Sequence, residues 1–149
     1  MRLSKNFSLE ELIESDTAER LYILNLPNDE QLKNLQLLTT VILQPLRDAL
    51  GYSIGINSGL RVPALNLALG GSKTSDHCHG LAADLRCFNN TELFLKIIEL
   101  KLPFKQLIWE FGTEDEPKWV HVSLDLSDKP KRQILQAVKE NGKTKYIKK

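Results

Sequence analysis

The sequence lacks the features that mark several large classes of protein. It has two cysteines, Cys78 and Cys87, which are too few for a disulfide framework. No apolar run approaches the roughly 20 residues of a membrane-spanning helix, so we expect no membrane span. The first seven residues lack the apolar core of a secretory signal peptide. We therefore expect synthesis in the cytoplasm, with any target outside it reached by other means.

The sequence also lacks an excess of positive or negative charge. The 20 basic and 19 acidic residues leave a formal charge of +1, so nothing in the composition attracts nucleic acid. The exception is a lysine cluster at 143–149, which can be read as a solvated, fraying end or as a contact for an anionic surface. With 149 residues, 42% of them hydrophobic, the chain is expected to form one monomeric domain over residues 1–149.

Helix signals dominate the first third of the chain. Ser8 and Glu11 have the spacing of a capping box, which predicts a short helix ending near Ile13 or Glu14. Asn28 to Gln31 repeats this signal before a longer helix. Pro45 should kink or split that helix near residue 43, and Gly51 should end it. The apolar residues that give this helix one buried face are Leu32, Leu35, Leu38, Ile42, Leu46 and Ala49.

The rest of the chain alternates short strands with short helices. The predicted elements are a strand at 53–57, a helix at 64–69, a strand at 81–87, a helix at 91–100 capped by Thr91, and a hairpin pairing 106–111 with 118–124. Asn141-Gly142 favours a type I′ hairpin that joins 134–139 to 143–147, whereas a helix over 131–140 also fits the pattern. The expected fold class is α+β, a single domain with a small antiparallel sheet and flanking helices.

A candidate metal site organises the chain. His77 and Asp84 lie seven residues apart across a glycine turn, and His121 lies in an alternating apolar run typical of a strand. Two imidazoles, one carboxylate and an open fourth position are typical of a catalytic zinc site. Asp84 is the most informative of the three, because its neighbours are apolar and an unpaired buried carboxylate is unfavourable. A metal ion or a strong hydrogen-bond network must compensate its charge.

Each candidate also has a structural interpretation without metal. A single histidine in a strand, such as His121, is more often a satisfied core or surface residue than a ligand. Cys78 lies between His77 and His79, so it could bind metal, but a neutral buried thiol is favoured. His79 shares the loop with His77, but it would share a face with His77 only in a regular strand, and a loop rich in glycine and serine need not keep that alternation.

Three ordered motifs resemble the zinc D-Ala-D-Ala carboxypeptidase family, and in particular the short endolysin-like members carried by bacteriophages. The motifs are Ser58-Gly59-x-Arg61, Ser75-x-His77-x-x-Gly80-x-Ala82-x-Asp84 and Trp119-Val120-His121-Val122-Ser123. The likeness extends from about Phe7 to about Ser123. It implies a hedgehog/DD-peptidase-like fold, and a metallopeptidase that acts on the stem peptides of peptidoglycan in the cell wall.

The resemblance also implies roles for individual residues. His77, Asp84 and His121 would bind Zn²⁺, and the fourth position would hold a water whose pKa the metal lowers. Arg61 would hold a substrate carboxylate or a polarised carbonyl oxygen, for which its planar charged group is suited. Ser75 would donate a hydrogen bond to substrate, although a simple turn or cap residue is the alternative. The protein would reach the cell wall by release at lysis or by assembly into a virion.

The general base is the point where the sequence departs from the family. Many members have glutamate three residues before the last histidine, and Lys118 occupies that position here. Glu110 and Glu116 are the remaining candidates. If the hairpin is symmetric about the 115–116 bond, Glu110 lies directly opposite His121, either as general base or as a carboxylate that orients the histidine. Glu116 lies in an acidic loop where a solvated role is the default, so we favour Glu110.

Three functions are then open. The first is a zinc-dependent hydrolase of peptidoglycan peptides, either a D-Ala-D-Ala carboxypeptidase or an endopeptidase. The second is a zinc-containing cell-wall-binding or virion module without catalysis, which Lys118 favours somewhat. The third is a fold without metal, which would leave the Asp84 carboxylate without a partner.

Overall fold

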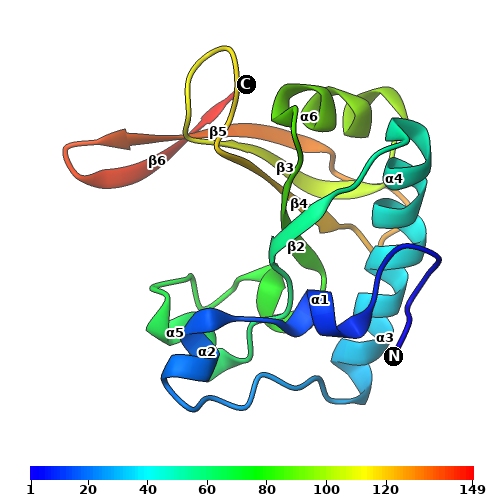
Figure 1. Ribbon diagram of the computed structural model, residues 1–149. Coiled ribbons are helices and arrows are strands. Elements are labelled where there is room, and N and C mark those ends of the chain that lie inside the picture. The colour runs from blue at the N-terminus through cyan, green and yellow to red at the C-terminus, as the bar shows by residue number, and fades with distance from the viewer.

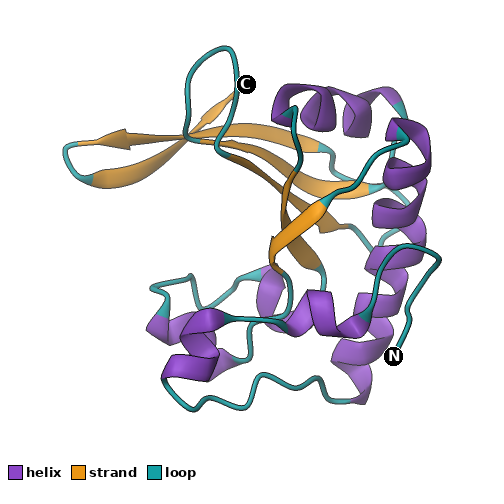
Figure 2. Cartoon of the chain, viewed as in Figure 1, coloured by secondary structure: helices purple, strands orange, loops and turns teal.

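A six-stranded sheet forms the centre of the structure, a computed structural model that describes residues 1–149 (Figure 1). The strand order across the sheet is β1-β2-β4-β3-β5-β6. The strands are β1 (Gly55–Ser58), β2 (Ala82–Arg86), β3 (Phe104–Glu110), β4 (Trp119–Leu124), β5 (Gln133–Glu140) and β6 (Lys143–Lys148). Helices lie beside the sheet and across one end of it (Figure 2). The α+β fold class predicted from the sequence is confirmed.

The sheet is mixed, which differs from the antiparallel sheet that we expected. Strand β5 runs parallel to β3, from Gln106 opposite Gln133 to Glu110 opposite Ala137, whereas every other pair is antiparallel. The loop 125–132 brings the chain back to the start of β3, where the Arg132 amide donates to the carbonyl of Phe104 at 3.0 Å. The sequence therefore predicted the hairpins β3–β4 and β5–β6, but not the parallel pairing of β3 with β5 that joins them.

One long helical segment covers a face of the sheet. It comprises α3 (Asp29–Leu38), a π-helical turn (Thr39–Leu43) and α4 (Gln44–Leu50). Pro45 explains the interruption, because it has no N–H and its ring disfavours the regular helix one turn earlier. The wider π turn accommodates that lost bond, with Gln44 N–H donating to Thr39. The helix ends at Gly51, whose φ is +77°, as predicted.

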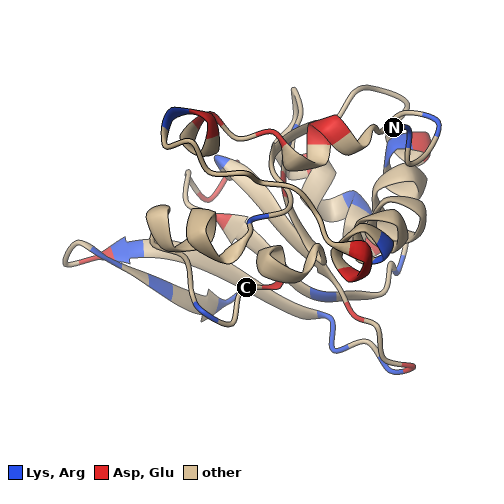
Figure 3. Ribbon diagram, turned by 90° about the horizontal axis from the view of Figure 1, so that it is seen from below, with Lys and Arg blue, Asp and Glu red and all other residues tan.

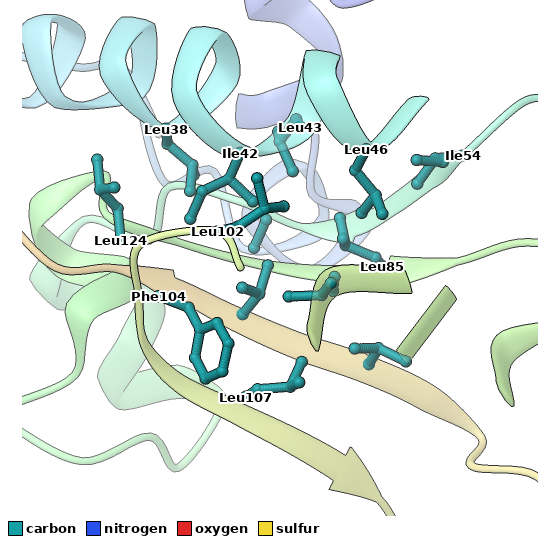
Figure 4. Close-up of a cluster of buried hydrophobic side chains, with 14 of the residues drawn as sticks. Leu38, Ile42, Leu43, Leu46, Ile54, Leu85, Leu102, Phe104, Leu107 and Leu124 are labelled. Carbon is teal, nitrogen blue, oxygen red and sulfur yellow. The ribbon is translucent and has the colours of Figure 1, made fainter. Parts of the chain in front are cut away.

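The core lies between this segment and the sheet (Figure 4). Leu38, Ile42 and Leu46 are fully buried, whereas Ala49, which we placed on the same face, is exposed. Successive side chains of a strand point to opposite faces of the sheet. Hence alternate residues of β2 and β4, such as Leu85 and Val120, enter this core, and the residues between them face the other side.

The remaining helices are short. They are α1 (Leu9–Ile13), α2 (Asp16–Arg20), α5 (Pro63–Ala68), the 3₁₀ helix η2 (Asp76–His79) and α6 (Asn90–Glu99). Both predicted capping boxes, at Ser8 and Asn28, are present. The sequence did not predict α2, and the N-cap of α6 is Asn89 rather than Thr91.

The final hairpin also follows its turn sequence. Asn141 and Gly142 both have positive φ, +53° and +76°, which a type I′ turn requires. The competing helix over 131–140 and the fraying end are therefore wrong, since 133–140 and 143–148 are paired strands. No helix has the length and apolar character needed to cross a membrane.

Candidate metal centre

Two adjacent strands bring the predicted ligands together. Asp84 in β2 lies directly opposite His121 in β4. Their neighbours Leu85 and Val120 are buried in the core, so strand alternation directs Asp84 and His121 to the opposite face. The period of two in each strand thus determines that both polar side chains leave the core on the same side.

Asp84 is the centre of the polar cluster. Its Oδ1 lies 3.0 Å from Nδ1 of His121 and 3.4 Å from Nε2 of His77, and its Oδ2 accepts from Nη2 of Arg61 at 3.1 Å. Burial alone would raise the pKa of Asp84, but the neighbouring His77 and His121 outweigh it and hold that pKa well below its usual range. The carboxylate is therefore ionised, with His121 beside Oδ1 and the guanidinium of Arg61 beside Oδ2.

His77 is fixed by a second hydrogen bond on the far side of its ring. Nδ1 lies 2.7 Å from the carbonyl oxygen of Gly59. A carbonyl can only accept, so Nδ1 carries the proton and Nε2 keeps its lone pair for a metal. Gly59 itself lies against α1, where an added Cβ would overlap the carbonyl oxygen of Leu12. Glycine is required here, because only its backbone can approach α1 this closely while aiming its carbonyl at His77.

The loop before β2 delivers His77 to this position. Ser75 Oγ accepts from the His77 amide at 3.2 Å and caps η2. Gly80 ends η2 with φ of +75°, and a Cβ there would lie 2.7 Å from the carbonyl oxygen of Gln31 in α3. The turn is therefore held against the long helix. Ser75 also lines the groove described below, so its contact with substrate stays a prediction beside the cap role that the structure shows.

Arg61 is held by its own motif. Its Nε donates to Ser58 Oγ at 2.9 Å, and its backbone N–H donates to the carbonyl of His77 at 3.0 Å. The spacing of Ser58-Gly59-x-Arg61 therefore has a physical reason. The serine orients the guanidinium, the glycine carbonyl orients His77, and the arginine reaches Asp84.

A groove of about 610 Å³ opens over this cluster and includes Glu110. The register differs from our prediction, because Ile108 lies opposite His121 and Glu110 lies opposite Trp119. A shift of two residues preserves the face, so Glu110 still points to the same side as His121. Glu110 is 7% exposed, and burial raises its pKa from 4.5 to about 7, which His121 partly opposes.

The other candidates lie outside the groove. Glu116 is exposed and its carboxylate accepts from the amide of Asn90 at the start of α6. Lys118, at the position where many family members have glutamate, is exposed and does not line the groove. His79 is exposed, and Cys78 is a half-buried thiol whose pKa is raised by burial. Neither belongs to the metal-binding group.

The three predicted ligands fit a metal ion. One donor atom from each of His77, Asp84 and His121 lies within 4.8 Å of the other two. Two imidazole nitrogens and a carboxylate oxygen suit zinc, and three protein ligands leave a position open for a reacting molecule. Together with the groove and its buried carboxylate, this set defines the class of protein as a metal-dependent enzyme.

A comparison with protein-family models identifies the family within this class. The family model described as Peptidase M15 matches residues 5–123, and the chain belongs to this family of zinc D-Ala-D-Ala carboxypeptidases. A comparison with curated proteins finds no match. The protein is therefore a zinc metallopeptidase of a family that acts on peptidoglycan peptides, and its His-Asp-His triad is positioned to bind the metal.

Sequence reasoning missed one wall of the groove. Leu135, Lys139, Thr144 and Tyr146 line it, and all four come from the β5–β6 hairpin. The Asn141-Gly142 turn predicted the hairpin itself. Its position depends on the parallel pairing of β5 with β3, for which the sequence holds no local signal.

Proposed function

We propose that the protein hydrolyses a peptide bond of the peptidoglycan stem peptide. It would act as a carboxypeptidase that removes a terminal D-alanine or as an endopeptidase that cuts within the stem. The observation that carries the proposal is the position of Glu110, a buried carboxylate in the same groove and on the same sheet face as the metal-binding triad. A module that only bound zinc would have no need of this carboxylate.

Glu110 is suited to move a proton. A general base works best when its pKa is close to the working pH, and burial raises the pKa of Glu110 to about 7. In the proposed reaction Glu110 takes a proton from the attacking water and returns it to the leaving amine. Glu116 is less suited to this role, because it lies in the β3–β4 loop outside the groove, where its carboxylate accepts from the amide of Asn90.

Arg61 would position the substrate. Its Nε and Nη2 are already engaged by Ser58 and Asp84, which leaves Nη1 for a carboxylate or carbonyl oxygen in the groove. Ser75, on the facing loop, would donate its hydroxyl proton to substrate while its oxygen caps η2. The chemistry that zinc supplies in such a site is Lewis acidity, which polarises a carbonyl group and makes water a stronger acid.

A digest of purified peptidoglycan and soluble muropeptides, analysed by mass spectrometry, tests the proposal. The protein is assayed as zinc-loaded, chelated and zinc-restored. We expect loss of one D-alanine or a cut within the stem, abolished by chelator and recovered with zinc. The mass of the product distinguishes the two activities. Stoichiometric zinc without cleavage of any muropeptide would instead support the non-catalytic module.

We further propose a role in bacteriophage lysis of the cell wall, because the three motifs resemble those of short phage-borne members of the family. In that role the protein reaches the wall at lysis or as part of a virion. Release of soluble fragments from purified cell walls by the protein alone would support a lysis enzyme. Activity on soluble muropeptides but not on intact walls would argue against it.

A further inference from the structure

The groove extends past the metal centre onto the β5–β6 hairpin, which lies beyond the residues 5–123 matched by the family. We propose that Lys139 and Tyr146 of this hairpin bind a carboxylate of the substrate away from the bond that is cut, and so select acidic stem peptides. This inference rests on the proposed function and names a specificity determinant for it. The hairpin projects from the body of the molecule (Figure 1).

Strand register places the hairpin beside the reacting groups. Ala137 of β5 pairs with Glu110 of β3 on one side and with Tyr146 of β6 on the other. Partners in register point to the same face of a sheet, so Glu110, Ala137 and Tyr146 form one row across three strands. Lys139 is two residues further along β5 on the same face, opposite Thr144. Ala137 between them is fully buried, whereas Glu110 and Tyr146 both line the groove.

The position of Lys139 suits an extended peptide. Two residues along a strand and one strand across correspond to about 8 Å between the Cα atoms of Glu110 and Lys139. An extended chain covers that distance in two to three residues. A peptide with its reacting bond near Glu110 can therefore place an acidic group two to three residues away at the ammonium of Lys139.

Lys139 carries the unpaired positive charge among the residues lining the groove. Its ammonium contacts Thr144 Oγ1 at 3.2 Å and lies 5.5 Å from the centre of the Phe111 ring, and it has no carboxylate within ion-pair distance. Two other charged residues of the groove have partners within the protein: Asp76 is paired with Lys105, and Asp84 is paired with Arg61. An ammonium with no carboxylate partner is free to bind one from the substrate.

Tyr146, two residues along β6 from Thr144 on the same face, supplies a second donor. Its hydroxyl can donate to a carboxylate oxygen, while the ring, 54% exposed, offers an apolar wall for the peptide. A lysine and a tyrosine together can donate to both oxygens of one carboxylate. A carboxamide cannot accept both hydrogen bonds in this way, because it has one acceptor oxygen and no charge.

The hairpin provides a matched control. Basic residues lie along it (Figure 3), and alternation divides them between its two faces. Lys143 and Lys145 face away from the groove, and Lys145 is paired with Glu140 at 3.2 Å. Lys143 has no ion pair, does not line the groove and lies in the same strand pair. Lys143→Met therefore removes the same charge from the same hairpin without touching the proposed site.

The test compares two soluble stem peptides of one sequence, one with free carboxylates away from the scissile bond and one with carboxamides there. For Lys139→Met we expect kcat/KM on the acidic peptide to fall about 10-fold through KM, as for a lost charged hydrogen bond. The change on the amidated peptide should stay below about twofold. Tyr146→Phe should lower the same preference about threefold, and Lys143→Met should leave both peptides unaffected.

Binding of the labelled acidic peptide to zinc-loaded Glu110→Gln protein, with and without Lys139→Met, separates this inference from the proposed hydrolysis. If the parent protein cleaves the peptides and Lys139→Met keeps the same kcat/KM, or loses equally on both peptides, the role of the hairpin is overturned and the hydrolase stands. Binding that prefers the acidic peptide through Lys139, without any cleavage, supports the hairpin and overturns the hydrolase. Absence of both binding and cleavage overturns both.

Discussion

The carbonyl oxygen of Gly59 holds the imidazole of His77 from the side opposite to the metal-binding position, at 2.7 Å from Nδ1. The same glycine touches α1, and the next residue, Leu60, donates its amide to the carbonyl of Leu12 at 2.8 Å. One backbone position therefore couples the packing of the N-terminal helix to the orientation of a metal ligand.

Gly59→Ala should damage both functions of this position. The added Cβ overlaps the Leu12 carbonyl, so we expect a loss of about 1–3 kcal/mol in the free energy of unfolding. The displaced carbonyl should weaken zinc binding by about 10- to 100-fold. Chemical denaturation and a competitive zinc titration measure the two effects. Gly51→Ala is the control, because its site at φ +77° has open space and lies at the end of α4. It should lower stability by about 1–2 kcal/mol and leave zinc affinity unchanged.

Removal of one ligand should abolish the metal site selectively. We expect His77→Ala to lose stoichiometric zinc, whereas His79→Ala, two residues away and exposed, should retain it. Zinc at about 1,000 times its dissociation constant should stabilise the parent by about 4 kcal/mol, and should not stabilise His77→Ala. Metal analysis after dialysis and thermal unfolding with and without zinc provide the measurement. Zinc retained by His77→Ala would exclude the proposed ligand set.

Glu110→Gln should separate metal binding from catalysis. The amide keeps the size of the side chain but cannot accept the proton, so we expect kcat to fall by about 10²- to 10⁴-fold with zinc content unchanged. Glu116→Gln should retain activity within about twofold, because that carboxylate lies outside the groove. Steady-state rates on a muropeptide, together with metal analysis, decide whether Glu110 or Glu116 is the general base. A large loss in Glu116→Gln alone would transfer the base role to that residue.

The stability of the metal-free protein should depend on pH through Glu110. Burial raises the pKa of Glu110 to about 7 in the folded state, whereas an unfolded glutamate ionises near 4.5. Below pH 4.5 both states hold the proton, and between about 4.5 and 7 only the folded state does. Stability relative to Glu110→Gln should therefore fall as pH rises through this window, by on the order of 3 kcal/mol, and then level off. Urea denaturation of both proteins from pH 4 to 8 checks it; a constant difference would contradict a buried Glu110.

Arg61→Lys tests the shape of the guanidinium rather than its charge. Arg61 already bonds Ser58 and Asp84 through two nitrogens, and a lysine has a single nitrogen for all partners. We expect kcat/KM to fall at least about 10-fold while zinc stays bound. Arg86→Lys, exposed and outside the groove, is the control and should keep the activity of the parent. Unchanged kinetics in Arg61→Lys would remove Arg61 from substrate binding.

Local patterns in the sequence were sufficient for the parts of the fold that depend on neighbours in the chain. The capping boxes at Ser8 and Asn28, the break before Pro45 and the turn at Asn141-Gly142 each follow from a few adjacent residues, and all are present. The assumption of a hairpin symmetric about the 115–116 bond correctly placed Glu110 and His121 on one face, although not directly opposite each other. Alternation is compatible with either pairing. It could not give the hairpin register, because a shift of two residues keeps the same face and the same pattern.

The sequence by itself singled out the candidate ligand set, because an aspartate among apolar residues needs a compensating partner and three ordered motifs resemble those of a zinc peptidase family. The structure brings these three candidates together. Only the tertiary structure decided what surrounds that set. The Gly59 carbonyl on His77, the position of Glu110 in the groove and the wall formed by Lys139 and Tyr146 all arise from pairs far apart in the chain. Such pairs form because the whole sheet and its helices bury their apolar faces together, and no short stretch of sequence contains that information.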